Sequence, residues 1–361
     1  MTDQIEKVFG RTLTEDFETI YLASHTDLNC LVNSNIVITG ASGFIGKWLT
    51  FSWLYARQKL DGKGKILLNS RNLTGLSKLC KSFEAGREIT YLESDIRTIA
   101  IPKTFNPDFL VHAATPASAQ LNKDDPSEML STIIDGQKQV LQQGMKSGVQ
   151  NILFLSSGAV YGTQPPDMRL IKETYVGGPS LSSVASAYHE GKRVAELLGN
   201  ISAEHGSLRF TTGRLFAFLA PYLPLNTHFA AGNFMSNALE NRNIEINSDG
   251  QSVRSYQYGT DLCVFLWALL NRGQSGEAYN VGSDEPILIS DLAMQIKEIV
   301  NPNIDVSFRK SDVKQISSRY VPDISKITQN LKVQNRYGAA DAIARTSAWW
   351  KDSKGGPNNE R

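Results

Sequence analysis

The chain has 361 residues, of which 41% are hydrophobic and 20% are charged, a composition typical of a globular protein with a large buried core. Its 37 lysines and arginines balance 36 aspartates and glutamates, so it lacks the basic field of a nucleic-acid-binding protein and we predict no nucleic-acid partner. The three cysteines follow no disulfide or metal-ligand spacing, and we predict neither a disulfide framework nor a metal site.

Residues 1–34 form an extension before the first predicted strand. They lack the basic and apolar regions of a signal peptide, and no later apolar stretch is long enough to span a bilayer. We therefore expect a cytoplasmic protein without membrane contact. Residues 14–18 resemble a helix start, which predicts a short helix that packs on the outside of the domain.

Short apolar runs alternate with helical patterns from residue 35 to residue 217. The predicted strands are residues 35–39, 65–68, 89–92, 109–113, 151–155 and 209–211. The predicted helices are residues 45–58, 127–147 and 184–204. Several strands are apolar at consecutive positions, which is typical of strands covered on both faces. This alternation predicts an α/β fold with a Rossmann-type doubly wound parallel sheet over residues 35–217.

The pattern changes after residue 217, where proline-rich loops and shorter elements begin. We predict helices near residues 229–241, 260–271 and 340–350 and strands near residues 244–246 and 253–258. Residues 218–352 are therefore expected to form a smaller α+β portion whose main role is to bind substrate. Some elements of this range are expected to pack into the Rossmann domain. Residues 353–361 are predicted to be a disordered tail.

A glycine-rich loop separates the first predicted strand from the first long helix. Gly40 permits a tight turn, Gly43 lets the backbone approach a pyrophosphate, and Gly46 lets the helix pack closely on the sheet. Backbone N–H groups at the helix start would face the phosphates. A glycine-containing turn alone is weak support, but the strand–turn–helix context favours dinucleotide binding. The predicted residues of this loop are Gly40, Ser42, Gly43, Phe44, Ile45 and Gly46.

The second predicted strand is followed by Arg71 and by no acidic residue. Because an acidic residue at this place holds the ribose of NAD and an arginine accommodates the 2′-phosphate of NADP, we predict NADP(H) over NAD(H). Arg71 as a plain surface charge is the alternative. Asp95 and Ile96 follow the third strand and are placed to meet the adenine. After the fourth strand, small residues leave room for the cofactor: Ala113, Ala114 and Thr115.

Tyr188 and Lys192 are spaced i, i+4, which places a phenol and an ammonium on one face of a helix. A nearby cation favours the phenolate, so we expect the pKa of the tyrosine to be lowered toward the working range. Such a pair can move a proton on or off an alcohol oxygen, although it can also be an ordinary helix-surface pair. Ser157 ends the fifth strand, where a hydroxyl projects into the crevice that binds ligands. His112, at the end of the fourth strand, is expected to be a hydrogen-bonded structural residue.

Together these motifs resemble the extended short-chain dehydrogenase/reductase family, in its nucleotide-sugar epimerase, dehydratase and ketoreductase branch. The resemblance runs from residue 35 to at least residue 326 and rests on TGASGFIG, DIR, HAAT, SSGAVYG, YHEGK and RSYQYGTDL. It implies that Tyr188 is the catalytic acid/base, that Lys192 holds the nicotinamide ribose, and that Ser157 hydrogen-bonds the reacting sugar oxygen.

The resemblance also implies a nucleotide-sugar substrate and a homodimer whose interface is a four-helix bundle of the helices at residues 127–147 and 184–204. Arg254 resembles the arginine that grips the nucleotide diphosphate, with a plain surface residue as the alternative. The remaining residues expected at the substrate are Ser118, His228, Asn233 and Phe234.

Departures from the family pattern bear on the reaction. Sugar-nucleotide dehydratases carry an Asp-Glu pair where this chain has Gly158 and Ala159, so an acid/base pair for elimination of water is missing. UDP-glucuronate decarboxylases share the run over residues 190–196 but carry a glutamate in place of Ala159. Many relatives have an asparagine where this chain has Ala217, so the contacts to the substrate phosphates must differ.

The reactions that remain after these exclusions are those that need only a serine, a tyrosine, a lysine and a nicotinamide cofactor. We expect reduction by NADPH of a nucleotide-linked 4-keto-6-deoxyhexose to a deoxysugar donor. A nucleotide-sugar 4-epimerase is the alternative, followed by a decarboxylase or dehydratase of the same family. A non-catalytic protein that senses NADP(H) is a third possibility, but such a sensor needs no proton donor.

Overall fold

The computed structural model describes residues 2–83, 86–115, 119–206, 208–225, 229–309 and 318–353. Two of the predicted substrate-binding residues, Ser118 and His228, lie outside these ranges, as does the predicted tail from residue 354 onward. Among the described residues, no helix combines the length and the apolar character needed to cross a bilayer.

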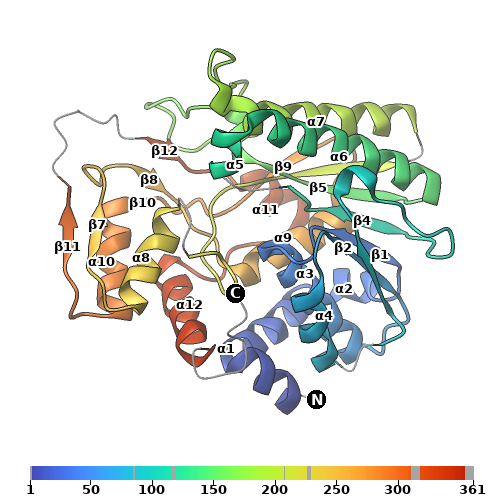
Figure 1. The fold of residues 1–361 in the computed structure, drawn as a ribbon, viewed down its shortest axis with the longest axis horizontal. Helices are drawn as coiled ribbons and strands as arrows, with labels where there is room; N and C mark the ends of the chain where they lie inside the picture. The colour runs from blue at the N-terminus through green and yellow to red at the C-terminus, as the bar shows by residue number, and fades with distance from the viewer. Residues whose placement is uncertain are drawn as a thin grey trace.

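A seven-stranded sheet forms the centre of the fold (Figure 1). All of its neighbouring strands run parallel. In spatial order the strands are β3 (Ile89–Glu93), β2 (Ile66–Ser70), β1 (Ile36–Thr39), β4 (Phe109–His112), β5 (Asn151–Ser157), β6 (Arg209–Leu215) and β9 (Ala278–Val281). The first six follow the strand order of the dinucleotide-binding fold. The predicted Rossmann-type doubly wound sheet is thereby confirmed.

Both faces of the sheet are buried, which explains the consecutive apolar residues in its strands. Ile36 and Ile38 of β1 contribute to one core, and Val37 between them contributes to the other. All three side chains are fully buried. Helices on the Val37 face include α5 (Ala119–Asp124), α6 (Pro126–Ser147) and α7 (Ala187–His205). On the opposite face lie α3 (Phe44–Lys59), α4 (Thr74–Cys80), α9 (Gly259–Arg272) and α11 (Ser325–Leu331) (Figure 1).

Local sequence determines where the long helix α6 begins and ends. The Asp125 side chain accepts a hydrogen bond from the backbone N–H of Glu128, and Pro126 occupies the first turn, where its missing N–H costs nothing. At the other end, Gly148 adopts a left-handed conformation with φ of 78° that satisfies the last carbonyls. The observed helix therefore agrees closely with the predicted range of residues 127–147.

The N-terminal extension is more extensively folded than predicted. It forms α1 (Thr2–Ala23), which is kinked at Gly10, and α2 (His25–Leu31). The Thr14 hydroxyl does not cap a new helix; it donates to the Gly10 carbonyl one turn earlier. Phe9 and Phe17 are buried in the core beside α3, whereas Glu6, Arg11 and Glu15 of the same helix are exposed. The extension is therefore an outer layer of the fold, and the predicted short helix at residues 14–18 is wrong in extent.

Ion pairs fix this layer to distant parts of the chain. Asp16 of α1 pairs with Arg345 of α12 (Ala339–Ser353) at 2.8 Å and accepts a hydrogen bond from the Tyr258 hydroxyl at 2.6 Å. Asp27 of α2 pairs with Arg272 at 2.7 Å. The first and last helices consequently lie side by side (Figure 1).

The smaller portion lies to one side of the parallel sheet (Figure 1). Its helices α8 (Ala230–Leu239) and α10 (Ile289–Val300) pack against each other and against α12. A two-stranded sheet consists of β7 (Ile244–Ile246) and β11 (Val306–Phe308). A three-stranded sheet has the order β10 (Ile287–Leu288), β8 (Val253–Arg254) and β12 (Arg319–Tyr320).

Two predicted elements differ in extent from the observed ones. The strand predicted at residues 253–258 ends at Arg254, because the chain leaves the small sheet there and Gln257 instead bridges to Phe218. The helix predicted at residues 184–204 begins at Ala187 and is preceded by a 3-10 turn, Val184–Ser186.

Candidate active site

The glycine loop after β1 is closely packed at two of its three glycines. Gly40 has a φ of 66°, and a Cβ atom on it would lie 2.7 Å from the backbone of Ala113. A Cβ atom on Gly46 would lie 2.3 Å from the Gly40 carbonyl oxygen. Gly43 is the residue that precedes α3, so the unbonded N–H groups of the first turn of that helix begin here. A larger residue at Gly40 or Gly46 would collide with the backbone of the loop or of Ala113, so glycine at these positions lets the loop keep the shape that suits a dinucleotide phosphate.

Hydroxyls and an amide occupy the end of β2, where many dinucleotide sites have a carboxylate. The Ser42 and Ser70 hydroxyls lie 2.6 Å apart, and the Asn69 amide donates to the Ser94 hydroxyl at 2.9 Å. The Arg71 side chain is exposed beside them. Carboxylates lie next to these groups: Glu93 of β3 is the ladder partner of Ser70, and Asp95 is close enough to Arg71 for the charge of Arg71 to contribute to its lowered pKa.

Asp95 and Ile96, predicted to meet the adenine, have partners within the protein. The Asp95 carboxylate accepts hydrogen bonds from the Arg97 guanidinium at 2.9 and 3.0 Å, and the hydrogen bonding of Arg97 keeps the pKa of Asp95 below its usual value. Ile96 is buried in the core beneath α6. A Cβ atom on Gly136 of α6 would lie 2.9 Å from the Ile96 side chain, so this glycine gives the isoleucine its space.

His112 at the end of β4 is buried, and its Nδ1 atom lies 2.8 Å from the Thr39 hydroxyl. Burial lowers the pKa of His112 to about 3, and the Lys192 charge acts in the same direction, so the imidazole is neutral at pH 7. The Thr39 hydroxyl also accepts the N–H of Ala114 at 3.2 Å. As expected from the sequence, His112 is a hydrogen-bonded structural residue, and it fixes the approach of the loop at residues 113–115 to β1.

Lys192 is almost completely buried and anchored by two oxygens. Its Nζ atom donates to the Thr115 hydroxyl at 2.9 Å and to the Leu155 carbonyl at 2.6 Å, and it lies 4.7 Å from the centre of the Phe154 ring. Burial lowers the pKa of Lys192 to about 7, while the charge of Glu196 opposes this shift. Two of the predicted site residues, Lys192 and Thr115, are thus in direct contact.

Tyr188 and Ser157 are brought together as well. The Ser157 hydroxyl is near enough to the Tyr188 phenol to act on its pKa, and the Ser157 Oγ atom accepts the backbone N–H of Ala159 at 3.1 Å. Burial raises the pKa of Tyr188, and the nearby Ser157 hydroxyl acts in the opposite direction. The lowered pKa expected from the spacing of Tyr188 and Lys192 is therefore not observed, because burial outweighs the other effects and the ammonium donates to Thr115 and Leu155.

The residues of the smaller portion that were predicted to bind substrate differ in their burial and in their contacts. The Arg254 guanidinium donates to the carbonyls of Val253 and Ser318 and to the Ser318 hydroxyl at 2.8–2.9 Å, and burial lowers its pKa. Asn233 of α8 is exposed, whereas the neighbouring Phe234 is buried in the main core. Of this pair, Asn233 is the one free to meet a ligand from solvent.

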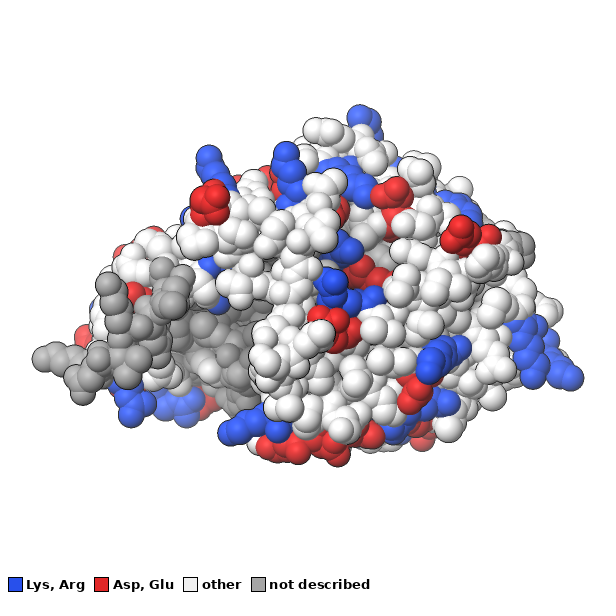
Figure 2. All heavy atoms as spheres, turned by 90° about the horizontal axis from the view of Figure 1, so that it is seen from above, with Lys and Arg blue, Asp and Glu red and all other residues white. Residues whose placement is uncertain are grey.

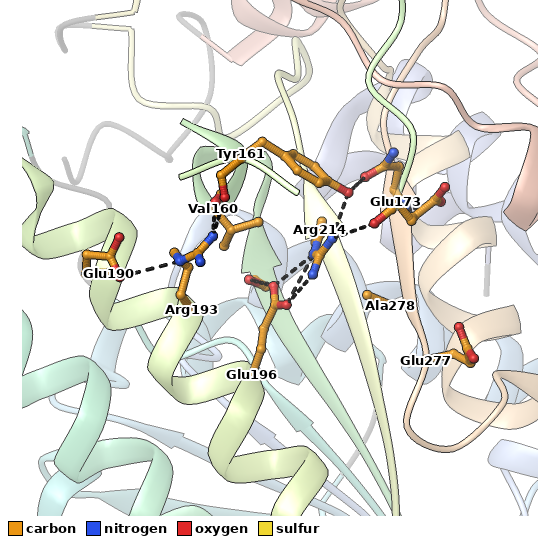
Figure 3. Close-up of polar contacts among 12 residues, drawn as sticks. Val160, Tyr161, Glu173, Glu190, Arg193, Glu196, Arg214, Glu277 and Ala278 are labelled. Carbon is orange, nitrogen blue, oxygen red and sulfur yellow. Dashed lines mark hydrogen bonds and ion pairs between the residues drawn. The ribbon is translucent and has the colours of Figure 1, made fainter. Parts of the chain in front are cut away.

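A buried polar network that the sequence did not reveal supports the end of β5 (Figure 3). The Arg214 guanidinium of β6 pairs with the Glu196 carboxylate of α7 at 2.7 Å, and the same carboxylate accepts the Ser156 hydroxyl. Arg214 also donates to the Tyr161 hydroxyl at 2.9 Å, which in turn donates to Asn280 of β9 at 2.8 Å. The residue before Ser157 is thereby tied to three neighbouring elements.

Tyr320 is a second residue of the site that the sequence did not reveal. Its hydroxyl donates a hydrogen bond to the Leu215 carbonyl at 3.5 Å, and its ring packs against the Phe216 ring at a tilt of 32°, with 4.6 Å between ring centres. The one indication in the sequence is Gly158: a Cβ atom there would lie 2.6 Å from the Tyr320 hydroxyl. A glycine at position 158 suggests that another side chain occupies the space beside it, but the sequence does not show which one.

The fold, the glycine cradle and the Ser157–Tyr188–Lys192 group together define the extended short-chain dehydrogenase/reductase class. A model of the NAD dependent epimerase/dehydratase family matches residues 36–282. The chain therefore belongs to the NAD dependent epimerase/dehydratase family, as its motifs predicted.

Individual relatives in this family are distant. UDP-glucuronic acid decarboxylase 3 of Arabidopsis thaliana is 28% identical over 314 residues, which cover 86% of this chain and 88% of the relative. UDP-glucuronic acid decarboxylase 1 of Xenopus tropicalis is 26% identical over 316 residues, which cover 88% of this chain and 70% of the relative. The UDP-glucose 4-epimerase structure of Thermotoga maritima has a TM-score of 0.74 at 20% identity and covers 89% of this chain and 99% of its own. The dTDP-glucose 4,6-dehydratase structure of Bacillus anthracis has a TM-score of 0.72 at 20% identity and covers 89% of this chain and 98% of its own. At this identity the structures show a shared fold.

Proposed function

We propose that the protein is an NADPH-dependent reductase that converts a nucleotide-linked 4-keto-6-deoxyhexose into a deoxysugar donor by reduction at C4. The observation that carries this proposal is the make-up of the site at the end of β5. Ser157 and Tyr188 provide hydroxyl groups there, while Gly158 and Ala159 provide no carboxylate. Elimination of water from a sugar needs a separate acid and base, whereas reduction of a ketone needs a single proton donor.

The residues present suit a nicotinamide dinucleotide. Gly40, Gly43 and Gly46 leave a cradle for the pyrophosphate at the start of α3, and Lys192 would hold the nicotinamide ribose. When bound, the reduced cofactor supplies the hydride. The family is NAD-dependent by description; our preference for NADPH rests on the neutral Ser42–Ser70 pair and on the exposed Arg71, which can meet a 2′-phosphate.

Tyr188 would deliver the proton, and its surroundings suit that direction of transfer. Because burial raises its pKa, the phenol stays protonated at neutral pH and is ready to act as an acid. The proton passes from the phenol to the oxygen at C4 as that oxygen becomes an alkoxide, and Ser157 hydrogen-bonds the same oxygen. Oxidation of an alcohol, the first step of an epimerase, would instead require the phenolate.

The test of this role is Tyr188→Phe. We expect turnover to fall by about 100-fold or more, as is usual for loss of a general acid, with NADPH affinity retained. Tyr279→Phe is the matched control, since it removes the hydroxyl of another buried tyrosine, in β9. Substantial activity in Tyr188→Phe would refute the assignment.

A 4-epimerase is the second candidate, because the same three side chains suffice for oxidation and re-reduction at C4. It predicts a tightly retained oxidised cofactor and no net redox change. The relatives named UDP-glucuronic acid decarboxylase favour a third reaction. By family resemblance, such decarboxylases share the run over residues 190–196 but carry a glutamate where this chain has Ala159, so we expect no carbon dioxide from UDP-glucuronic acid. Release of carbon dioxide in that assay would overturn the choice of reaction.

For the substrate nucleotide, we propose contacts from Arg254 and Asn233 in the smaller portion. Arg254→Ala should raise KM for the nucleotide sugar and leave NADPH affinity unchanged. An unchanged KM would remove Arg254 from the site.

We further propose that the protein is a homodimer through α6 and α7. Three apolar side chains on α7 are exposed at intervals of three and four residues, as expected for an uncovered helix face: Val194, Leu197 and Ile201. Leu197→Glu should convert a dimer into a monomer in light scattering. A wild-type protein that is monomeric at micromolar concentration would contradict the proposal.

On the face seen in Figure 2, cationic and anionic side chains of the described residues are interspersed over most of the surface, and anionic side chains gather along its lower edge.

A further inference from the structure

The first turn of α7 carries Tyr188 and has no cap from its own sequence. Because α7 begins at Ala187, the backbone N–H of Tyr188 is one of the four that have no acceptor within the helix. Ser186, at the N-cap position, makes no capping hydrogen bond with its side chain. Its hydroxyl donates instead to the Ser180 carbonyl at 2.7 Å. The usual local device that fixes a helix start is therefore not used here.

A side chain from α5 supplies the cap. The Asn122 Oδ1 atom accepts the Tyr188 N–H at 3.1 Å, and the Asn122 Nδ2 atom donates to the Ala185 carbonyl at 2.8 Å. One amide group thus joins the turn that precedes α7 to the first turn of α7. An amide side chain suits both contacts, because it carries an acceptor and a donor at once.

The short helix α5 is itself held on a rigid support. The Asp125 N–H donates to the Leu121 carbonyl at 2.8 Å, and the Asp125 side chain accepts the Glu128 N–H at 2.9 Å, so α5 leads directly into the capped start of α6. Glu128 pairs with Arg97 at 2.9 Å, which ties this end of α6 to the turn after β3. Leu121 packs against the same core cluster as Tyr188. Asn122 therefore reaches α7 from a fixed base.

A second residue that follows β4 also holds α7. The Thr115 hydroxyl accepts the Lys192 ammonium at 2.9 Å, one helical turn beyond Tyr188. Tyr188 is thus held through its backbone by Asn122, and Lys192 is held through its side chain by Thr115. Both anchors come from the same side of α7, so they keep the two predicted catalytic residues in register with the end of β4.

We propose that Asn122 is a positioning residue of the reaction: it fixes the start of α7 and thereby the place of the Tyr188 phenol relative to the sugar oxygen that receives its proton. Asn122 acts through the backbone of Tyr188 and not on the reacting atoms. Since a displacement of a catalytic group by about 1 Å can cost about 100-fold in rate, two hydrogen bonds at the base of this side chain are enough to affect turnover. The inference rests on the proposed role of Tyr188 as proton donor.

The experiment compares Asn122→Ala with Gln120→Ala in the full-length protein. Gln120 is exposed on the same short helix and donates to Asp124 at 2.6 Å, so Gln120→Ala removes a hydrogen bond within α5 and none to α7. We expect Asn122→Ala to lower kcat by about 10-fold, between the worth of one hydrogen bond and that of a misplaced catalytic group, with KM for NADPH unchanged. Gln120→Ala should keep the wild-type values of both. A wild-type kcat in Asn122→Ala would overturn the proposal.

Asn122→Asp separates the two hydrogen bonds of the amide. An aspartate keeps an oxygen for the Tyr188 N–H, and its negative charge is favourable at a helix N-terminus, but it has no proton for the Ala185 carbonyl. We expect Asn122→Asp to keep kcat within about 3-fold of the wild type. A loss as large as that in Asn122→Ala would overturn the claim that the bond to Tyr188 positions the phenol. If Asn122→Ala fails to fold, Asn122→Leu takes its place, because leucine has the shape of asparagine and no hydrogen-bonding atoms.

Nuclear magnetic resonance of labelled tyrosine rings follows the position of Tyr188 without any turnover. Tyr188→Phe identifies the Tyr188 signal by its loss. We expect this signal to shift in Asn122→Ala and to stay in place in Gln120→Ala, and an unchanged signal in Asn122→Ala would overturn the proposal. If the wild type turns over no nucleotide sugar, the proposed reductase activity is wrong, while the Tyr188 signal still decides the role of Asn122.

Discussion

Removing the charge of Glu196 tests how far the buried network behind Ser157 holds the fold together. Glu196→Gln preserves the shape of the side chain but leaves the Arg214 guanidinium without an anion. Breaking a buried ion pair by removing one partner costs about 3–5 kcal/mol. The side chains of Arg214 and Glu196 are 17% and 10% exposed, and glutamine keeps one acceptor for the guanidinium. We therefore expect the free energy of unfolding to fall by about 2–4 kcal/mol.

Glu240→Gln is the matched control. Glu240 pairs with Arg242 at 2.8 Å and accepts a serine hydroxyl, as Glu196 does, but the two side chains of this pair are 36% and 55% exposed. At such a surface site the same change should cost less than about 0.5 kcal/mol. Urea unfolding would be followed by circular dichroism and by tryptophan fluorescence, whose coincidence justifies a single free energy. Equal effects of the two substitutions would refute the claim that burial makes the Glu196 pair important.

Three further outcomes follow from single sites. Gly199→Ala should destabilise the fold by about 1–3 kcal/mol in urea unfolding, because its Cβ would lie 1.9 Å from the Phe210 ring; Gly75→Ala, with nothing within 4 Å, should stabilise by up to about 1 kcal/mol. His112 has a pKa lowered to about 3, so the unfolded chain binds its proton first as pH falls. Stability should then drop below pH 6.5 by at most about 1.4 kcal/mol per pH unit from this residue, and His112→Gln should remove that slope. Arg71→Ala should weaken NADPH binding in titration calorimetry and leave NADH binding unchanged; equal losses for both cofactors would contradict its contact with the 2′-phosphate.

The parts of the fold that local rules control could be predicted from the sequence. Consecutive apolar residues in β1 reflect burial on both faces, and the limits of α6 follow from its capping residues. The contact between Ser157 and Tyr188 was also accessible, since one residue ends a parallel strand and the other begins the helix that follows it. For β1 and α6 the signal lies within a few residues of the feature that it predicts.

Contacts between distant segments could not be predicted in this way. Tyr320 reaches the Leu215 carbonyl at the end of β6 only because β12 pairs with β8, and both strands are two residues long. Arg214 meets Glu196 through the packing of α7 on β6, and Asp16 meets Arg345 across almost the whole chain. The residues of each pair are far apart in the sequence, so no local sequence pattern predicts that they are in contact.

The pKa of Tyr188 shows a different kind of failure. The spacing of Tyr188 and Lys192 correctly placed them on one helix, but the direction of the pKa depends on burial and on where the ammonium donates its hydrogen bonds. Those are properties of the packed site. A raised pKa favours a phenol that gives a proton, as the proposed reduction requires.

The most direct test of the proposed function is the oxidation of NADPH by the purified protein, measured by loss of cofactor absorbance with a panel of nucleotide-linked sugars. The panel contains 4-keto-6-deoxyhexoses on different nucleotides, ordinary nucleotide hexoses and UDP-glucuronic acid. We predict NADPH consumption that depends on one of the keto sugars and that is lost in Tyr188→Phe. Interconversion of two hexose epimers without any loss of NADPH would contradict the reductase and establish an epimerase.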